Sequence, residues 1–256
     1  GAGNTTDITS TGTLSAGSGA TATFTNGVLA SHSVTISNTG SFTITATDSA
    51  GGLGGGTETG SSASFTVDPG SLNHFLVEAF GGGAIGAQTV NIAFNIRITA
   101  QDFNNNTVTA FTGAGNTADI TSTGTLSAGG GVTAAFTNGV LASHSVTISN
   151  LGSFTITATD SAGGLGTGSE TGVSNSFTVD PGPLDHFVVE AVGGGAIGTQ
   201  TAAVAFNIQI TAEDANNNTM TFFDGAGNTV EITSTGTLSA GAGTTATFTN
   251  GILASH

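Results

Sequence analysis

The sequence predicts an all-β protein made of tandem immunoglobulin-like β-sandwich domains, with seven to nine strands in each. Three observations lead to this prediction: a long internal repeat, short runs in which apolar and polar residues alternate, and turn signals at close intervals. No segment has the periodicity of an amphipathic helix. Many short strands with turns every 8–12 residues, roughly a hundred residues to a copy, are typical of a sandwich, and the alternative is a small barrel.

The repeat is marked by the pentapeptide GAGNT, which begins at Gly1, Gly113 and Gly225. The copies align without gaps, so the period is 112 residues. Solenoid repeats are shorter, at about 20–50 residues, and a period of this length therefore corresponds to whole domains.

The prolines indicate where one domain ends and the next begins, because proline interrupts strand pairing. All three lie at the same place in the repeat, within VDPG and VDPGP. We therefore expect residues 69–180 to form one complete domain. Residues 1–68 are then the C-terminal part of a preceding copy, and residues 181–256 are the N-terminal part of a following copy.

The clearest predicted strand runs from residue 90 to residue 100, where apolar and polar side chains alternate. Its expected core face is Val90, Ile92, Phe94, Ile96, Ile98 and Ala100, and its outer face is Asn91, Ala93, Asn95, Arg97 and Thr99. Similar patterns predict strands at 132–136, 146–148 and 154–159. The remaining strands are expected around Phe75 and Val77, Val108 and Phe111, Ile120, and Phe177 and Val179.

Asparagine supplies the predicted tight turns. Asn138-Gly139 and its two repeats, Asn26-Gly27 and Asn250-Gly251, stand between apolar runs and favour two-residue type I′ hairpins. Asn105 and Asn217 are expected to adopt a left-handed backbone conformation in another turn.

Three segments resemble the bacterial immunoglobulin-like tandem repeats of large surface proteins, broadly the invasin/intimin-like group. They are ITAQDFNNNTVTAFTG at 98–113, ITAEDANNNTMTFFDG at 210–225, and GSFTITATDSAGG at 152–164. In that group a strand ends in Ala-x-Asp and a tight turn follows, often with glycine where this chain has Asn105 or Asn217. The resemblance implies a rigid spacer or stalk module, sometimes with an adhesive domain elsewhere, and it identifies no ligand.

Composition excludes several functions. The net charge is −15, Arg97 is the single cationic side chain, and there is no Lys or Cys. Such a chain repels nucleic acids and anionic membranes, and it cannot form disulfides or Lys–Asn isopeptide bonds. We expect an extracellular or cell-surface location. No apolar stretch is long enough to span a bilayer, and the first residues lack a signal-peptide pattern, so an export signal or anchor is expected to have been removed or to lie outside this segment.

We expect neither an enzyme nor a bound cofactor. The five histidines occupy two repeated positions, His32, His144 and His256 in one and His74 and His186 in the other, and are expected to be structural. Asp185 precedes His186, but Asn73 precedes His74, so an essential Asp–His pair is not expected. No Gly-x-Ser-x-Gly motif stands between a strand and a helix.

Calcium is the one metal considered, because it prefers oxygen ligands from loops. Two places qualify: an Asp/Asn-rich turn in each copy, and the junction between domains, where a linker aspartate could meet a Gly-rich loop. The turn residues are Asp102, Asn104, Asn105 and Asn106, with Glu213, Asp214, Asn216, Asn217 and Asn218; the junction residues are Asp68 and Asp180, with Asp48, Glu58, Asp160 and Glu170. The alternative is that these side chains cap turns by hydrogen-bonding backbone amides.

The predicted function is a structural fibre or stalk whose main partners are neighbouring repeats or further copies of the chain. The incomplete terminal copies predict head-to-tail polymerisation by strand addition. A plainer explanation is that the 256 residues are an excerpt from a longer array. The alternative function is an adhesin or calcium-dependent module that binds glycan, ice or a host surface through outer Thr and Asn rows.

Overall fold

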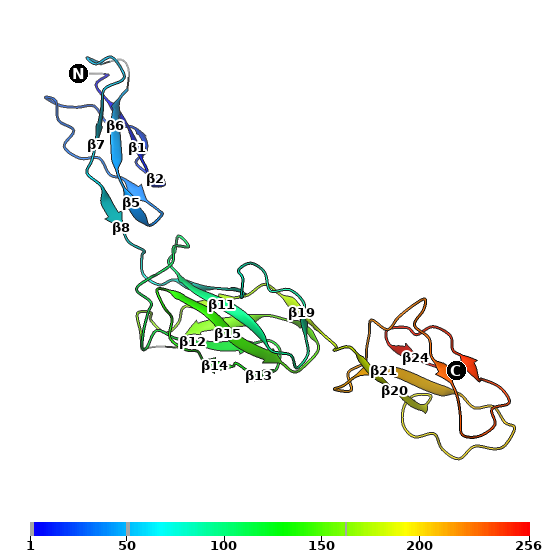
Figure 1. Cartoon of the computed structure of the whole chain (residues 1–256). Helices are drawn as coiled ribbons and strands as arrows, with labels where there is room; N and C mark the ends of the chain where they lie inside the picture. The colour runs from blue at the N-terminus through cyan, green and yellow to red at the C-terminus, as the bar shows by residue number, and fades with distance from the viewer. Residues whose placement is uncertain (1–2, 50–51, 162) are drawn as a thin grey trace.

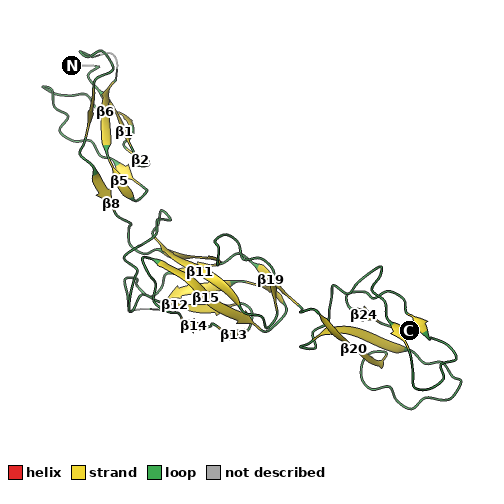
Figure 2. Ribbon diagram, viewed as in Figure 1, coloured by secondary structure: helices red, strands yellow, loops and turns green. Residues whose placement is uncertain are grey.

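The computed structural model describes residues 3–49, 52–161 and 163–256. These residues form three units that follow one another along the chain (Figure 1). Every regular element among them is a strand (Figure 2), and none is a helix of the length and hydrophobicity needed to cross a bilayer. The all-β prediction is therefore confirmed.

The strands divide among the first unit (β1–β8), the middle unit (β9–β19) and the third unit (β20–β24). The first unit contains β1 (Thr6–Ser10), β2 (Leu14–Ala16), β3 (Gly19–Ala20), β4 (Thr35–Ile36), β5 (Gly40–Phe42), β6 (Ile44–Asp48), β7 (Thr59–Ser61) and β8 (Phe65–Val67). The middle unit contains β9 (His74–Ala79), β10 (Gln88–Thr89), β11 (Phe94–Gln101), β12 (Ala118–Ser122), β13 (Leu126–Ala128), β14 (Gly131–Val132), β15 (Val140–Ile148), β16 (Gly152–Phe154), β17 (Ile156–Asp160), β18 (Thr171–Val173) and β19 (Phe177–Asp180). The third unit contains β20 (Leu184–Ala191), β21 (Ile208–Asp214), β22 (Glu231–Ile232), β23 (Gly243–Thr244) and β24 (Ile252–Leu253).

The middle unit is a sandwich of two four-stranded antiparallel sheets. One has the strand order β13-β15-β11-β9 and the other β14-β12-β17-β18. A third strip, β10-β19-β16, contains a parallel pair in which Thr89 lies opposite Asp180. β9 of the first sheet packs against β17 and β18 of the second, so the inner faces of the two sheets enclose the core.

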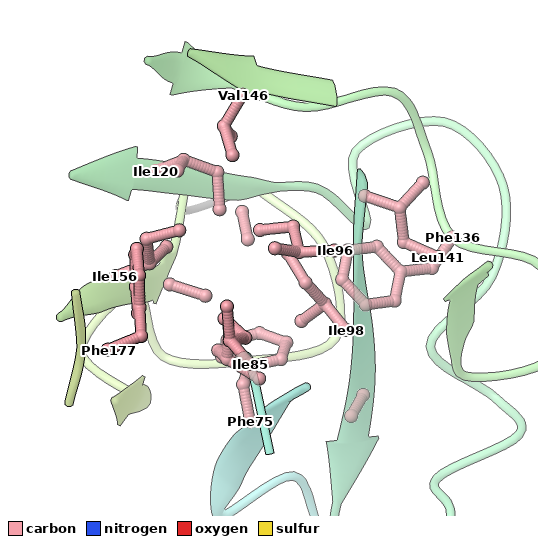
Figure 3. Packing of buried hydrophobic residues seen from close by; sticks show 14 of the residues in the cluster. Phe75, Ile85, Ile96, Ile98, Ile120, Phe136, Leu141, Val146, Ile156 and Phe177 are labelled. Atoms are coloured by element: carbon pink, nitrogen blue, oxygen red, sulfur yellow. The ribbon is translucent and has the colours of Figure 1, made fainter. Parts of the chain in front are cut away.

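The core of the middle unit is apolar and continuous (Figure 3). Ile96 and Ile98 from one sheet and Ile156 from the other are all fully buried. Three phenylalanine rings pack at one end, with centroid distances of 5.6 Å for Phe75–Phe111, 5.7 Å for Phe75–Phe136 and 5.0 Å for Phe111–Phe136. Such aromatic pairs contribute about 0.5–1.5 kcal/mol each beyond their buried area.

The third unit repeats this aromatic cluster with Phe187, Phe223 and Phe248, whose centroids lie 4.9–5.9 Å apart. Its sheet β20-β21-β24 corresponds to β9-β11-β15 of the middle unit, and the sheet β3-β1-β6-β7 of the first unit corresponds to β14-β12-β17-β18. The buried cluster of the middle unit extends from Leu72 to Val179. The domain boundaries at 68/69 and 180/181 stay a prediction.

The strand predicted from residue 90 to residue 100 is shorter than expected, since β11 begins at Phe94. Ile92 was expected in the core and is 60% exposed, so that assignment is wrong. Asn91 has a φ of 60°, and this left-handed residue turns the chain between β10, in the three-stranded strip, and β11, in a four-stranded sheet. Alternation alone did not reveal that the chain changes sheets at this point.

Two further predicted strands are also shorter or more interrupted in the structure than expected. At 132–136 only β14 forms, and Val132 is 65% exposed while Phe136 enters the core from a loop. The predicted strand at 154–159 is interrupted at Thr155, whose backbone pairs with Thr123, so that β16 joins β19 while β17 joins β12 and β18. Because the chain changes sheets at such points, one predicted strand becomes two shorter ones. The middle unit, from β9 to β19, therefore has more strands than the seven to nine expected.

The turn predictions are confirmed. Asn138 and Gly139 have φ angles of 48° and 79°, as a type I′ hairpin requires. The equivalent asparagines and glycines of the other two units also have positive φ angles. Asn105 and Asn217 are left-handed, at 64° and 61°. These asparagines fix where each chain reversal occurs.

We predict that Gly172→Ala destabilises the middle unit by about 1–3 kcal/mol, because a Cβ at Gly172 would overlap the carbonyl oxygen of Phe75 and force β18 away from β9. Gly60→Ala, at the equivalent position of the first unit, is the matched control, since a Cβ there meets nothing within 4 Å. Urea titrations followed by hydrogen exchange of the β9 and β18 amides measure the effect. Equal stability of the two variants would contradict the close packing of β18 on β9.

Candidate functional site: the linkers between units

The linker between the first and middle units is fastened by a buried carboxylate. Asp102, at the end of β11, is 3% exposed, and its Oδ2 accepts a hydrogen bond of 2.9 Å from the amide of linker residue Gly70. Its Oδ1 accepts the amides of Asn104 and Asn106, both at 2.9 Å. The Asn106 side-chain amide also donates to both carboxylate oxygens. The carboxylate is thus surrounded by N–H donors.

The second linker is fastened in the same way. Asp214 is fully buried, and its Oδ2 accepts the amide of Gly182 at 2.8 Å. Its Oδ1 accepts the amides of Asn216 and Asn218 at 2.9 Å, and the Asn218 side chain donates to both oxygens. We call each arrangement a linker clamp: the Asp102 clamp holds Gly70 and the Asp214 clamp holds Gly182.

The linker clamps have the hydrogen bonds expected of the turn-capping alternative. Each carboxylate accepts several N–H groups, which satisfies the lone pairs that a calcium ion would otherwise use. The left-handed Asn105 and Asn217 close the turns that present these amides. Calcium binding at the Asp/Asn-rich turns stays an untested prediction.

The pKa values of the two clamp carboxylates reflect these contacts. Burial raises the pKa of Asp102, but hydrogen bonds from the Asn106 side chain and from backbone amides lower it by more. The pKa of Asp102 therefore lies below its ordinary value. The same opposing effects leave the pKa of Asp214 lowered. Both carboxylates are therefore ionised at neutral pH, as the hydrogen bonds require.

The first linker also contacts the preceding unit. The Asn106 side-chain amide donates to the carbonyl oxygen of Ser37 in the first unit, at 2.9 Å. A cavity of about 410 Å³ lies beside this bond, between the loop at 36–39, the linker and the Asp102 turn, and Phe103 at its edge is 82% exposed. The predicted glycan, ice or host-surface ligand stays untested.

The predicted junction site is only partly assembled. Asp68 lines the cavity just described and a second one of about 600 Å³, which also includes Leu165 from the Gly-rich loop. Asp180 accepts a hydrogen bond from the Thr178 hydroxyl at 3.3 Å. Within the described ranges, no three His, Cys, Asp or Glu side chains gather as a metal site. The linker aspartates and the loop acids therefore do not form one acidic cluster there.

Two acids of the Gly-rich loop do converge. Asp160 is 2% exposed and its Oδ2 accepts the amide of Gly168 at 2.9 Å. Glu170 accepts the Thr167 amide and hydroxyl. A Cβ on Gly166 would overlap Asp160 Oδ2 and lie 2.9 Å from Glu170 Oε2, so only a glycine fits between the two carboxylates. The sequence prediction named both acids but missed Gly166, because nothing in a glycine-rich run singles out one glycine.

Burial raises the pKa of Asp160, and the neighbouring Glu170 charge raises it further, outweighing the hydrogen bond from Gly168. The pKa of Glu170 is lowered, because hydrogen bonds from Thr167 and Ser169 outweigh its burial. The surroundings of Glu170 therefore stabilise its anionic form, whereas those of Asp160 disfavour it.

The histidines have structural contacts. His32, His144 and His256 each place Nε2 2.8–2.9 Å from a glycine carbonyl, to which the ring donates. His74 contacts Asn73 and Gln101, whereas His186 contacts Asp185 and Glu213. The equivalent positions thus keep their contacts while amide partners are exchanged for carboxylates.

No protein-family model and no curated protein matches the chain. Among solved structures, the chain aligns with the Escherichia coli adhesin FdeC at 17% identity and a TM-score of 0.36, covering 84% of this chain and 64% of that one. It also aligns with domains 4–9 of the surface layer protein SbsC at 18% identity and a TM-score of 0.30, covering 85% and 29%. The chain thus spans less than two thirds of either protein. Similarity at this level identifies neither a family nor a function.

We predict that Asp102→Asn releases the first linker and lowers the stability of the middle unit by about 1–3 kcal/mol at pH 7, because the new amide cannot accept all the buried N–H groups. Since the folded-state pKa of Asp102 is lowered, its stabilisation is present above its ordinary pKa and is lost as the pH falls through the lowered value. The difference between wild type and variant should therefore shrink in acid.

Amide exchange at Gly70 and urea titrations between neutral and acidic pH measure both effects. Asp119→Asn, which changes a half-buried carboxylate on β12, is the control and should leave Gly70 exchange unchanged. Unchanged Gly70 exchange in Asp102→Asn would contradict the clamp.

Proposed function

We propose that this chain is part of a non-catalytic, extracellular stalk or fibre in which successive sandwich domains are joined by stiff linkers. The observation that carries the proposal is the linker clamp, which recurs at both junctions with the same geometry. Gly70 and Gly182 each donate a backbone amide to a buried aspartate of the following unit. A linker held in this way presents each domain at a defined angle to the next.

Linker length supports the same function. β8 ends at Val67 and β9 begins at His74, while β19 ends at Asp180 and β20 begins at Leu184. Pro69, Pro181 and Pro183 further restrict these short segments. Flexible tethers are usually longer and lack such bonds, whereas short, hydrogen-bonded connections favour a semi-rigid rod.

Charge and composition support an exported, surface-exposed role. A net charge of −15 keeps the chain soluble and favours an extended arrangement of its domains. The absence of Cys and Lys leaves packing and hydrogen bonds as the source of stability. The resemblance of the repeats to the invasin/intimin-like group supports the same role, and the adhesive function known for some surface proteins is not needed to explain the clamps.

We predict a narrow distance distribution between the outer units. The chain has no native cysteine, so spin labels placed through Ser61→Cys and Thr199→Cys report this distance by pulsed electron paramagnetic resonance. Adding Asp102→Asn and Asp214→Asn should broaden the distribution. Asp119→Asn with Glu231→Gln, at equivalent positions of β12 and β22, should leave the distribution unchanged. A broad distribution in the labelled chain before clamp removal would refute the stiff stalk.

A finer form of the proposal is association of chains by strand complementation. In the middle unit, Phe75 and Val77 of β9 are 2% and 4% exposed because β17 and β18 cover them. Their counterparts in the third unit, Phe187 and Val189, are 37% and 51% exposed. The first unit carries β7, the counterpart of β18, with all three of its residues exposed. A second copy therefore offers the segment that fits the exposed face of β20.

We predict that the 256-residue chain associates head to tail as its concentration rises, measured by sedimentation velocity. Val189→Asp should weaken association at least tenfold, since it places a charge on the apolar face. Val132→Asp is the control, because Val132 is similarly exposed, at 65%, but lies on the middle unit. A chain that stays monomeric at all accessible concentrations would refute complementation and leave the stalk proposal standing.

A further inference from the structure

The last residue of β17, just before the Gly-rich loop, has a buried oxygen without a hydrogen-bond partner. Asp160 Oδ2 accepts the Gly168 amide, but Asp160 Oδ1 is buried and has no hydrogen-bond partner. A buried carboxylate oxygen without a donor is strongly disfavoured, because it has lost its water and gained nothing in exchange. Asp102 differs, because both of its carboxylate oxygens accept hydrogen bonds from N–H donors.

The second carboxylate makes the orphaned oxygen harder to explain without a ligand. Glu170 is fixed by Thr167 and is oriented towards Asp160, with Gly166 between them. Two anions that converge on one point repel each other unless a proton or a cation lies between them. Because Gly166 has no Cβ, both carboxylates can approach this point of the loop, where any other residue would overlap Asp160 Oδ2.

The chain itself has almost no cation to offer. It has no Lys, and its single arginine, Arg97, lies on β11 of the other sheet. The ion pairs found among the described residues all involve His186, in the third unit. The positive charge that balances Asp160 and Glu170 must therefore come from solution, as a proton or as a metal cation.

We propose that Asp160 and Glu170 bind a calcium ion in the Gly-rich loop of the middle unit. Calcium suits this loop because it accepts irregular sets of six to eight oxygens at about 2.3–2.6 Å, including backbone carbonyls and water. Magnesium is smaller and demands a regular octahedron, which an irregular glycine-rich loop does not present. The site differs from the junction site predicted from sequence, because the linker aspartate Asp68 is not one of its ligands.

The first unit contains the same arrangement. A Cβ on Gly54 would overlap Asp48 Oδ2 and lie 2.9 Å from Glu58 Oε2, and Gly56 donates to Asp48 as Gly168 does to Asp160. This pair is more exposed than its counterpart. The same acid–glycine–acid arrangement thus occurs at equivalent positions of both units. In the middle unit the aspartate oxygen Asp160 Oδ1 is buried without a partner.

Calcium in this loop would act on the linker. Leu165 belongs to the same loop, lies in the cavity formed with Asp68, Pro69 and Gly70, and donates its amide to Asn116 Oδ1 at 2.8 Å. A cation that orders the loop also orders this wall of the linker cavity. The inference does not depend on the stalk proposal, since the site lies within one unit.

The test is titration of the full chain with calcium chloride at pH 7, followed by calorimetry and by hydrogen exchange of peptides covering residues 163–170. At calcium concentrations about ten times the measured Kd, exchange by local opening should slow about tenfold relative to EGTA. The loop-specific readout separates this site from the equivalent pair in the first unit. Magnesium chloride at the same concentration should produce a smaller effect.

Three variants complete the test. Glu170→Gln and Gly166→Ala should each abolish calcium protection of the loop, the first by removing a ligand and the second because its Cβ displaces the Asp160 carboxylate. Gly198→Ala is the control, since a Cβ there meets nothing within 4 Å. Asp160→Asn should lower the calorimetric stoichiometry by one. The proposal is overturned if calcium leaves exchange at 163–170 unchanged in the wild-type chain, or if the protection persists in Glu170→Gln.

Discussion

The structure depends on how buried carboxylates are satisfied in a chain that has almost no positive charge. Sixteen acidic residues face one arginine, so ion pairs with Lys or Arg cannot balance them. At both linkers the solution is hydrogen bonding, in which a buried aspartate collects backbone amides from its own turn and from the linker glycine. The carboxylate that must be satisfied thus becomes the group that fixes the linker. The same contact thereby satisfies the buried charge and holds the linker glycine.

Asp102 and Asp160 are both buried aspartates, but their pKa values are shifted in opposite directions. Both are nearly fully buried, and in both cases burial raises the pKa. Around Asp102, donors from Asn106 and Gly70 reverse the effect, whereas Asp160 has an orphaned oxygen and a neighbouring anion. By linkage, ionised Asp102 stabilises the fold above its ordinary pKa, whereas Asp160 disfavours the fold when ionised and is relieved as the pH falls through its raised value. The number of N–H donors, more than the depth of burial, decides between the two.

Much of the fold was predictable because its signals are local. The type I′ turns at Asn138-Gly139 and the left-handed Asn105 follow from what asparagine and glycine tolerate, and β11 follows from two-residue alternation. The failures at Ile92 and Thr155 occur where the chain changes sheets, since partner choice is a tertiary property that alternation does not encode. At the candidate sites the acids were found from their type, but the partner of each was not. Whether an aspartate receives amides or faces another carboxylate depends on loop geometry.

Differences between copies separate the structural features from the incidental ones. Phe103 in the exposed cavity becomes Ala215, and Arg97 becomes Gln209, so neither side chain is needed by every copy. Asp102 and Asp214, in contrast, accept the same four kinds of N–H donor: the linker glycine amide, two asparagine backbone amides and one asparagine side-chain amide. They do so although Phe103, next to Asp102, corresponds to Ala215, next to Asp214. A binding surface would be expected to keep its aromatic anchor and tolerate changes in the turn beneath it. The chain does the reverse, and this is why we propose linker geometry, more than ligand recognition, as the role that its copies share.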